Sequence, residues 1–173
     1  TIWELWYGPS EGRGMNSRVH IMFGGPGVWL YNYAGGISQT ADSIGFEHAV
    51  LTPPARLIQQ AADPSSANAE SSSSPPLRWA SVSKRFPRGQ YGLNWKLQNA
   101  TTVAVTSTIP ANAVGDTVLP TLGKDAHVTE GGHDVWLAGK YVPGVTGITG
   151  AVKSGDSIVV SHGSGEYDFV VAM

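Results

Sequence analysis

The residues of this sequence best suited to chemistry lie within its first twenty positions. Glu4 stands between Trp3 and Trp6, and a glycine-containing loop separates this block from a single histidine, His20. An indole ring can cover the apolar C–H face of a pyranose, while a carboxylate can bind sugar hydroxyls or activate a water molecule. The block therefore predicts a sugar-binding cleft, with Glu4 as a general base and His20 as a hydrogen-bond donor to a sugar hydroxyl.

The same residue types also have structural interpretations. Glu4 could be an ordinary glutamate at the end of a strand or helix, and His20 could be a buried histidine with satisfied hydrogen bonds. Trp29 could stack on sugar, but it lies on a short helical stretch, where we expect it to pack in a core. Trp79 and Trp95 lie on alternating stretches, and we expect both in the core of a β-structure.

Other kinds of site find little support in the sequence. His127, His133 and His162 are too scattered, each beside glycine or valine, to predict a metal site. The sequence has no cysteine, so disulfides and thiolate metal sites are excluded. Gly24–Gly27 lacks the Lys-Ser/Thr pair that follows the glycines of a phosphate-binding P-loop. We therefore expect neither a metal nor a cofactor.

Composition restricts the class of protein further. The 173 residues suffice for one ordinary domain, or for a fragment of one domain with a small second domain. A net charge of −2 gives no electrostatic footprint for nucleic acid or an anionic membrane. No apolar run approaches the roughly 18–20 residues of a membrane span. Because the chain begins at Thr1 inside the aromatic block, we expect a processed or truncated product.

One further signal concerns the compartment. Asn99-Ala100-Thr101 is an acceptor triplet for N-glycosylation, provided that the protein is secreted by a eukaryote. Such triplets also arise by chance in chains of this size. With the glycan-binding interpretation of the N-terminal block, the triplet predicts an extracellular or secreted glycoprotein modified at Asn99.

Helical spacing is confined to one stretch near the N-terminus. Gly24–Gly27 predicts the start of a helix with proline in its first turn, and Gly35-Gly36 predicts its end. Apolar residues recur between and just beyond these signals at Val28, Tyr31, Ala34 and Ile37. A helix of about ten residues is marginal alone, so it must pack against other elements. No later stretch predicts a helical partner.

From Gly45 onwards the pattern changes to short strands separated by turn signals, at a spacing typical of a sandwich. Ala61–Pro76 is rich in serine and proline and predicts a polar loop. The expected strands are Phe46–Thr52, Leu77–Phe86, Tyr91–Leu97, Thr101–Ile109, Ala113–Leu119, His127–Thr129, Val135–Leu137, Lys140–Val142, Val145–Val152, Ile158–His162 and Tyr167–Ala172. The sequence therefore predicts a mainly β protein, an antiparallel β-sandwich preceded by a short helical segment.

A family resemblance rests on six blocks, which in chain order are TIWELW, NSRVHIMFGGPGVWLYNYAGGI, GFEHAVLTP, ASVSKRFPRGQYGLNWKL, VTSTIPANAVGDTVLP and GSGEYDFVV. Together they resemble the C-terminal part of bacterial-type α-L-rhamnosidases, which are inverting glycoside hydrolases with an (α/α)6-barrel catalytic domain and a C-terminal β-sandwich. The resemblance covers nearly the whole chain outside the loop at 61–76. It implies that residues 1–44 are the end of the barrel and that residues 45–173 are the C-terminal sandwich domain.

The resemblance also implies roles for the N-terminal residues. Glu4 matches the general base, His20 matches the histidine that lines the rhamnose site, and Trp3 and Trp6 frame that pocket. Val19 departs from the pattern, because the family commonly has asparagine there. The general acid of the family lies upstream in the barrel, and an inverting mechanism needs both carboxyl groups, roughly 6.5–9.5 Å apart. We therefore expect the isolated chain to be inactive.

Two hypotheses follow. In the first, the chain is the C-terminal fragment of an α-L-rhamnosidase-like enzyme, acting on a rhamnose-containing glycan together with the upstream part of the catalytic domain. In the second, it is a non-catalytic extracellular module, glycan-binding or structural, that assembles with other copies of itself through apolar residues at its N-terminal end. Those residues are Trp3, Trp6, Val28 and Tyr31.

Overall fold

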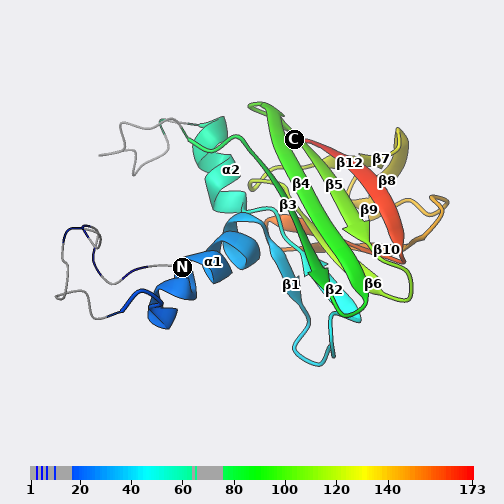
Figure 1. The fold of residues 1–173 in the computed structure, drawn as a ribbon. Helices are drawn as coiled ribbons and strands as arrows, with labels where there is room; N and C mark the ends of the chain where they lie inside the picture. Colours follow the sequence, from blue (N-terminus) through cyan, green and yellow to red (C-terminus); the bar gives the residue numbers. More distant parts are fainter. Residues whose placement is uncertain are drawn as a thin grey trace.

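The computed structural model shows two β-sheets packed face to face, with two helices beside them (Figure 1). It describes residues 3, 5, 7, 10, 17–63, 65 and 76–173. The predicted mainly β fold and the predicted sandwich are confirmed. None of the described helices has the length and apolar character that crossing a membrane requires.

Strand order defines the two layers. The five-stranded sheet has the order β1-β2-β6-β11-β10, and the seven-stranded sheet has the order β3-β4-β5-β12-β7-β8-β9. Their bounds are β1 Ile37–Gln39, β2 His48–Leu51, β3 Trp79–Phe86, β4 Gly89–Asn99, β5 Thr102–Ile109, β6 Val114–Pro120, β7 His127–Glu130, β8 His133–Leu137, β9 Lys140–Tyr141, β10 Ile148–Ser154, β11 Ser157–His162 and β12 Gly165–Ala172. Neighbouring strands are antiparallel except β2 and β6, which run parallel.

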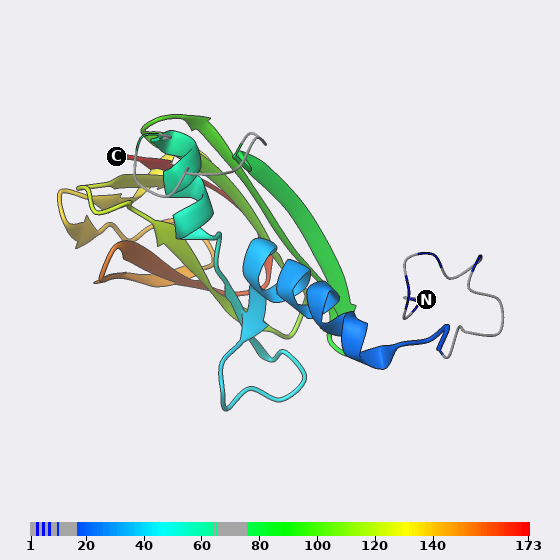
Figure 2. The same cartoon turned by 90° about the vertical axis from the view of Figure 1, so that its left-hand side faces the viewer.

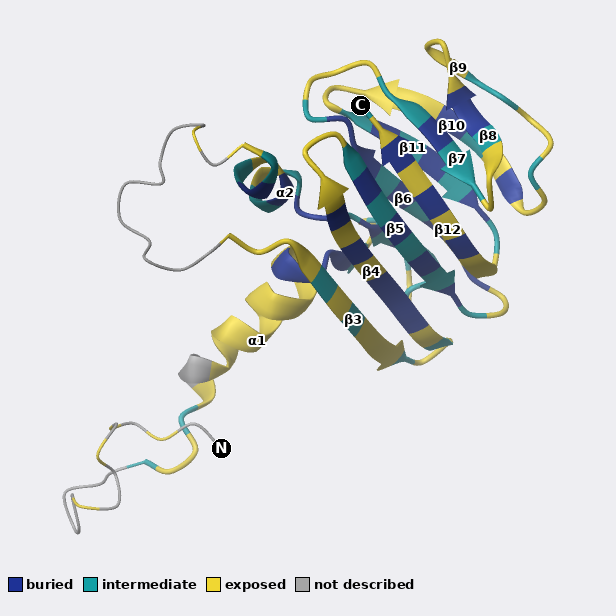
Figure 3. Cartoon of the chain, turned by 90° about the horizontal axis from the view of Figure 1, so that it is seen from above, coloured by how far each residue is buried: buried dark blue, intermediate teal, exposed yellow. Residues whose placement is uncertain are grey.

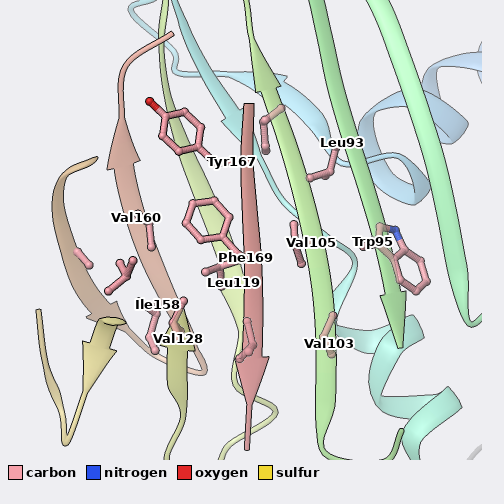
Figure 4. Packing of buried hydrophobic residues seen from close by; sticks show 14 of the residues in the cluster. Leu93, Trp95, Val103, Val105, Leu119, Val128, Ile158, Val160, Tyr167 and Phe169 are labelled. Atoms are coloured by element: carbon pink, nitrogen blue, oxygen red, sulfur yellow. The ribbon is translucent and has the colours of Figure 1, made fainter. Parts of the chain in front are cut away.

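The core lies between the inner faces of the two sheets (Figure 4). Along β5 the side chains alternate strictly between half-buried and buried, as a strand with one face on a core must. Phe169 of β12 and Leu119 of β6 come from opposite sheets and are both almost completely buried. Almost every predicted strand is present with ends shifted by a few residues, because alternation with a period of two is a strong local signal.

Two short elements were not predicted. Strand β1 pairs with β2, so Ile37 belongs to the five-stranded sheet and its predicted place at helical spacing is wrong. Helix α2 (Ala55–Ala62) follows Pro53-Pro54, which come directly after the expected strand Phe46–Thr52 and can equally mark the end of a strand. Proline is well tolerated at a helix start, and the residues that follow are good helix formers. Ile58 and Ala61 of α2 are buried.

The N-terminal helical segment runs through three kinds of turn: η2 (Ile21–Gly24), α1 (Gly25–Trp29) and η3 (Leu30–Ala34), the last with π-helical hydrogen bonding. Figure 2 shows the segment beside β3, and in the view of Figure 3 it points away from the sheets, with its C-terminal end nearest to them. There the Trp95 indole N–H lies 3.5 Å from the Ala34 carbonyl oxygen. The segment then ends at Gly35-Gly36, as predicted.

Trp79 and Trp95, both in the seven-stranded sheet, differ in burial. Trp95 is 2% exposed, as predicted, whereas Trp79 is 61% exposed, so its predicted place in the core is wrong. Directly opposed residues of antiparallel strands share a face of the sheet. Ala80 stands opposite Trp95 on the inner face, and Trp79 stands opposite Lys96 on the outer face. The register between β3 and β4, which no single stretch encodes, decides this difference.

Candidate functional site

The predicted sugar site is described only in part. Glu4 and Trp6 lie outside the described residues. Trp3 is about one-third exposed, and the central carbon of the Arg18 guanidinium lies 5.6 Å from the centre of its ring. That separation falls within the range of a cation–π interaction. Position 3 therefore lies beside the segment that carries His20.

His20 lies at the start of the helical segment. It has an extended backbone and immediately precedes η2, and its side chain is half-buried. The helical turn η2 therefore fixes where the His20 backbone lies. Trp3 and His20 both lie close to Arg18, by contact and in sequence respectively. A common sugar cleft stays a prediction.

Arg18 is a candidate site residue that the sequence pattern did not single out. A guanidinium carries five N–H donors and no acceptor, so it can bind sugar hydroxyls or a carboxylate while it rests on an indole. Its position two residues before His20, in the block that carries the family resemblance, is the signal that could have identified it. The contact with Trp3 required the fold.

The helical segment next to this region presents large apolar side chains to solvent. We call Val28, Trp29, Leu30, Tyr31 and Tyr33 the exposed helix surface; each is between 39% and 61% exposed. The expected place of Trp29 in a core is therefore wrong. Figure 3 shows the exposed colour along almost all of this segment, in contrast to the banded strands.

Few contacts hold this surface to the rest of the described chain. The Trp29 and Tyr33 rings are 5.4 Å apart and tilted, which is a contact within the segment itself. The Lys84 ammonium lies 4.6 Å from the centre of the Tyr31 ring and provides one contact with β3. Among the described residues of the segment, Ala34 is the one with a buried side chain. The surface is thus suited to covering by another body.

The outer face of the five-stranded sheet carries a histidine, an aspartate and a serine. His48 Nε2 lies 2.8 Å from Asp116 Oδ2, and the Ser161 hydroxyl donates to Asp116 Oδ1 at 2.6 Å. The serine bonds the carboxylate and not the imidazole, so this cluster cannot pass a serine proton to the histidine as a hydrolytic triad does. The cluster links three neighbouring strands.

His162 on the inner side of β11 has a structural environment. Its Nδ1 lies 3.1 Å from the Gly163 carbonyl oxygen, and its Nε2 lies 2.8 Å from the Thr117 hydroxyl. Because a carbonyl only accepts, Nδ1 carries the proton and Nε2 accepts from Thr117. Burial lowers the pKa of His162, while the Gly163 hydrogen bond and the Asp116 charge act in the opposite direction. The side chain is therefore a neutral, buried component of the core.

The remaining candidate residues give no further centre. His127 pairs with Asp134 at 2.7 Å, and in the part of the chain that the structure describes no group of three or more potential ligands could hold a metal ion. Asn99 is exposed at the end of β4, and its side-chain oxygen accepts from the Thr101 backbone N–H at 2.9 Å. Glycosylation of Asn99 stays a prediction.

Comparison with family models finds one match, over more than half of the chain. The family model described as "Bacterial alpha-L-rhamnosidase C-terminal domain" matches residues 36–134. No curated protein matches the chain. Among solved structures, the α-L-rhamnosidase of Dictyoglumus thermophilum is similar with a TM-score of 0.63 and 23% identity, covering 92% of this chain and 15% of that chain.

Two further solved structures are similar in fold. The α-L-rhamnosidase of Streptomyces avermitilis, in complex with L-rhamnose, gives a TM-score of 0.64 at 20% identity, covering 98% of this chain and 13% of that chain. The α-L-rhamnosidase of Aspergillus terreus gives a TM-score of 0.50 at 20% identity and covers 97% of this chain and 14% of that chain. The chain thus spans no more than 15% of the length of these proteins.

Proposed function

Because the chain belongs to the family of bacterial α-L-rhamnosidase C-terminal domains, we propose that it is the C-terminal part of an α-L-rhamnosidase-like glycoside hydrolase. Its substrate in this role is a glycan that carries an α-linked L-rhamnose. The family match supports this assignment for residues 36–134. The similarity in fold to three α-L-rhamnosidases over more than nine-tenths of the chain supports it for the whole.

We further propose that the N-terminal block forms one side of the rhamnose site. Glu4 is the general base that activates the attacking water, and His20 donates to a sugar hydroxyl. Trp3 and Trp6 frame the ring, and Arg18, held against Trp3, adds hydroxyl-binding N–H groups. An inverting hydrolase needs a second carboxyl group as the general acid. In this proposal that group belongs to the preceding barrel, so the 173-residue chain alone is inactive.

The observation that carries the proposal is the exposed helix surface. Five large apolar side chains lie on one short segment that has few contacts with the sandwich, although such a helix is marginal without packing. Contiguous apolar patches of this kind mark surfaces that another body covers. The partner we propose is the preceding part of the (α/α)6 barrel, with the helical segment up to Gly35-Gly36 as its end. Because β1 pairs within the five-stranded sheet, the proposed sandwich domain begins before the expected boundary at residue 45.

The same surface favours a second candidate function. A non-catalytic extracellular module could cover its apolar helix by associating with other copies of itself, since an exposed self-complementary patch favours closed dimers or filaments. In this version Trp3, Trp6, Val28 and Tyr31 form an assembly interface, and the chain binds or organises glycans without cleaving them.

Turnover of an aryl α-L-rhamnoside tests the proposal. We expect no turnover by the 173-residue chain, and turnover when the upstream part of the catalytic domain is supplied, either covalently or as a separate chain. Glu4→Gln should then lower the rate by about 10²–10⁴-fold, the usual contribution of general acid–base catalysis. Glu11→Gln, seven residues further along the chain, is the matched control and should leave the rate unchanged.

Two outcomes would reject the catalytic assignment. Turnover by the isolated chain would show that its own residues form a complete site. An unchanged rate in Glu4→Gln would remove Glu4 from the mechanism. Sedimentation of the isolated chain decides the alternative, because a concentration-independent monomer argues against self-assembly through the helix surface.

A further inference from the structure

The outer face of the seven-stranded sheet has a hollow that is separate from the N-terminal block. It spans β3, β4 and β5 and has a volume of about 410 Å³. This lies within the roughly 300–1,000 Å³ of small-molecule sites. The outward side chains that line it are Trp79, Ser81, Asn94, Lys96, Ala104 and Thr106.

The register of the three strands builds this hollow from two rows. Trp79, Lys96 and Ala104 stand opposite one another in the first row. Ala104 carries only a methyl group, so the side chains of this row rise far above the sheet at the Trp79 indole on β3 and only slightly on β5. The indole of Trp79, which is largely exposed, therefore borders a depression.

The second row supplies polar groups whose orientation is fixed. Ser81, Asn94 and Thr106 stand opposite one another, and the Ser81 hydroxyl donates to the Asn94 side-chain oxygen at 2.6 Å. The Thr106 hydroxyl donates to Asp168 Oδ1 at 2.7 Å. The Asn94 side-chain oxygen thus already accepts a hydrogen bond, and the Thr106 hydroxyl already donates its proton. The Asn94 N–H groups and the oxygen lone pairs of Thr106 remain as donors and acceptors for a ligand.

We propose that this hollow is a second, non-catalytic glycan site that binds a pyranose ring. The ring stacks on Trp79, and its hydroxyls bind Asn94, Thr106 and the Lys96 ammonium. A flat apolar side beside groups that both donate and accept matches a sugar, which has C–H faces and a rim of hydroxyls. The inference goes beyond the proposed catalytic role, because none of these residues belongs to the N-terminal block.

The charges and side chains around the hollow select a sugar over other ligands. Asp168 lies beside the hollow and Glu166 is on the same strand face, so Lys96 is not part of a basic track such as a nucleic-acid strand requires. The outward side chains beside Trp79 in the hollow are polar or small, unlike the apolar centre of a protein–protein interface. One aromatic ring and a few hydrogen bonds imply weak, millimolar-class binding, which a glycan with repeated units could strengthen by multivalency.

Nuclear magnetic resonance titration of the full 173-residue chain tests this site. The probes are methyl α-L-rhamnopyranoside and, in a parallel series, methyl β-D-galactopyranoside. We expect saturable shifts of the Trp79 indole N–H and the Asn94 side-chain amide with at least one of the two. Trp79→Ala should weaken binding by at least tenfold, and Asn94→Ala by about three- to tenfold, as expected for loss of a stacking ring and of one hydrogen bond.

Trp29→Ala is the matched control, because Trp29 is another exposed tryptophan, on the helical segment instead of the sheet. It should leave the affinity unchanged. Trp79→Tyr keeps an aromatic face and should retain measurable binding, even if Trp79→Ala fails to fold. No saturable shift with either glycoside would overturn the inference. Shifts confined to Trp3, Arg18 and His20 would also overturn it, because they would place binding at the N-terminal block. The catalytic proposal is tested by a separate measurement, the turnover of an aryl rhamnoside.

Discussion

The N-terminal helical segment and the β-sandwich meet at Gly35-Gly36 and differ in how they are held. In the sandwich, large side chains such as Leu93 and Phe169 are buried between two sheets. In the helical segment, side chains of the same kind, such as Leu30 and Tyr33, are about half exposed. Burial of apolar surface is the main stabilising contribution to folding. The sandwich therefore carries its own stability, whereas the segment depends on whatever covers it.

The same substitution in the two regions should give the largest contrast. Leu93 is fully buried and Leu30 is 55% exposed. Leu93→Ala removes buried methyl groups and leaves a cavity, so it should lower the free energy of unfolding by about 3 kcal/mol. Leu30→Ala should change it by no more than about 0.5 kcal/mol. Urea unfolding of both variants measures this, and equal losses would show that the helical segment is packed as firmly as the core.

The junction between the two regions gives the next largest effect. Gly36 has a φ of +68°, and a Cβ there would overlap the carbonyl oxygen of Thr52. Gly36→Ala should therefore cost about 2–3 kcal/mol, from the left-handed backbone and the forced shift of β1.

Gly27 is the control for that substitution. It lies inside α1, and a Cβ there would meet no atom within 4 Å. Gly27→Ala should be neutral or stabilise the protein by up to about 1 kcal/mol, because alanine favours helix over glycine. Thermal unfolding of the two variants tests the pair, and a stable Gly36→Ala would show that the junction is not fixed.

The pH dependence of stability should be the smallest effect and should come from the sandwich. Burial lowers the pKa of His162 below its ordinary value of 6.5. Below about pH 6.5 the unfolded chain therefore binds a proton that the folded chain does not, and stability falls as the pH falls towards the folded pKa. His162→Gln should reduce this dependence, measured by urea unfolding at several pH values. His48→Gln, at a more exposed histidine, serves as the control. An unchanged pH dependence in His162→Gln would contradict the burial argument.

The sequence predicts a region well when interactions between neighbouring residues determine its structure. It predicts a region poorly when contacts between distant residues do so. The strands from β3 to β12 were predictable because their alternation is a local signal that the final fold also satisfies. Helix α2 was missed because two prolines before it resemble a strand end as much as a helix start. Trp79 was misplaced because its face depends on pairing with β4, more than ten residues away in the chain.

The candidate site divides in the same way. Glu4, Trp3, Trp6 and His20 were identified from residue type and spacing, and their roles remain predictions. The contact of Arg18 with Trp3 and the exposed indole of Trp79 beside Asn94 came from the fold. Both depend on residues far apart in the sequence that only folding brings together.

By itself, the sequence determined the mainly β class, the end of the N-terminal helical segment, the buried place of Trp95 and the block that carries the family resemblance. These follow from periodicity, glycine positions and residue types that act over a few neighbouring residues. Only the tertiary structure decided which tryptophans face solvent, which histidine is buried, and that the helical segment presents its apolar side chains outward. Those properties depend on strand register and on the packing of distant elements, since burial belongs to the assembled sheets and not to any one stretch of chain.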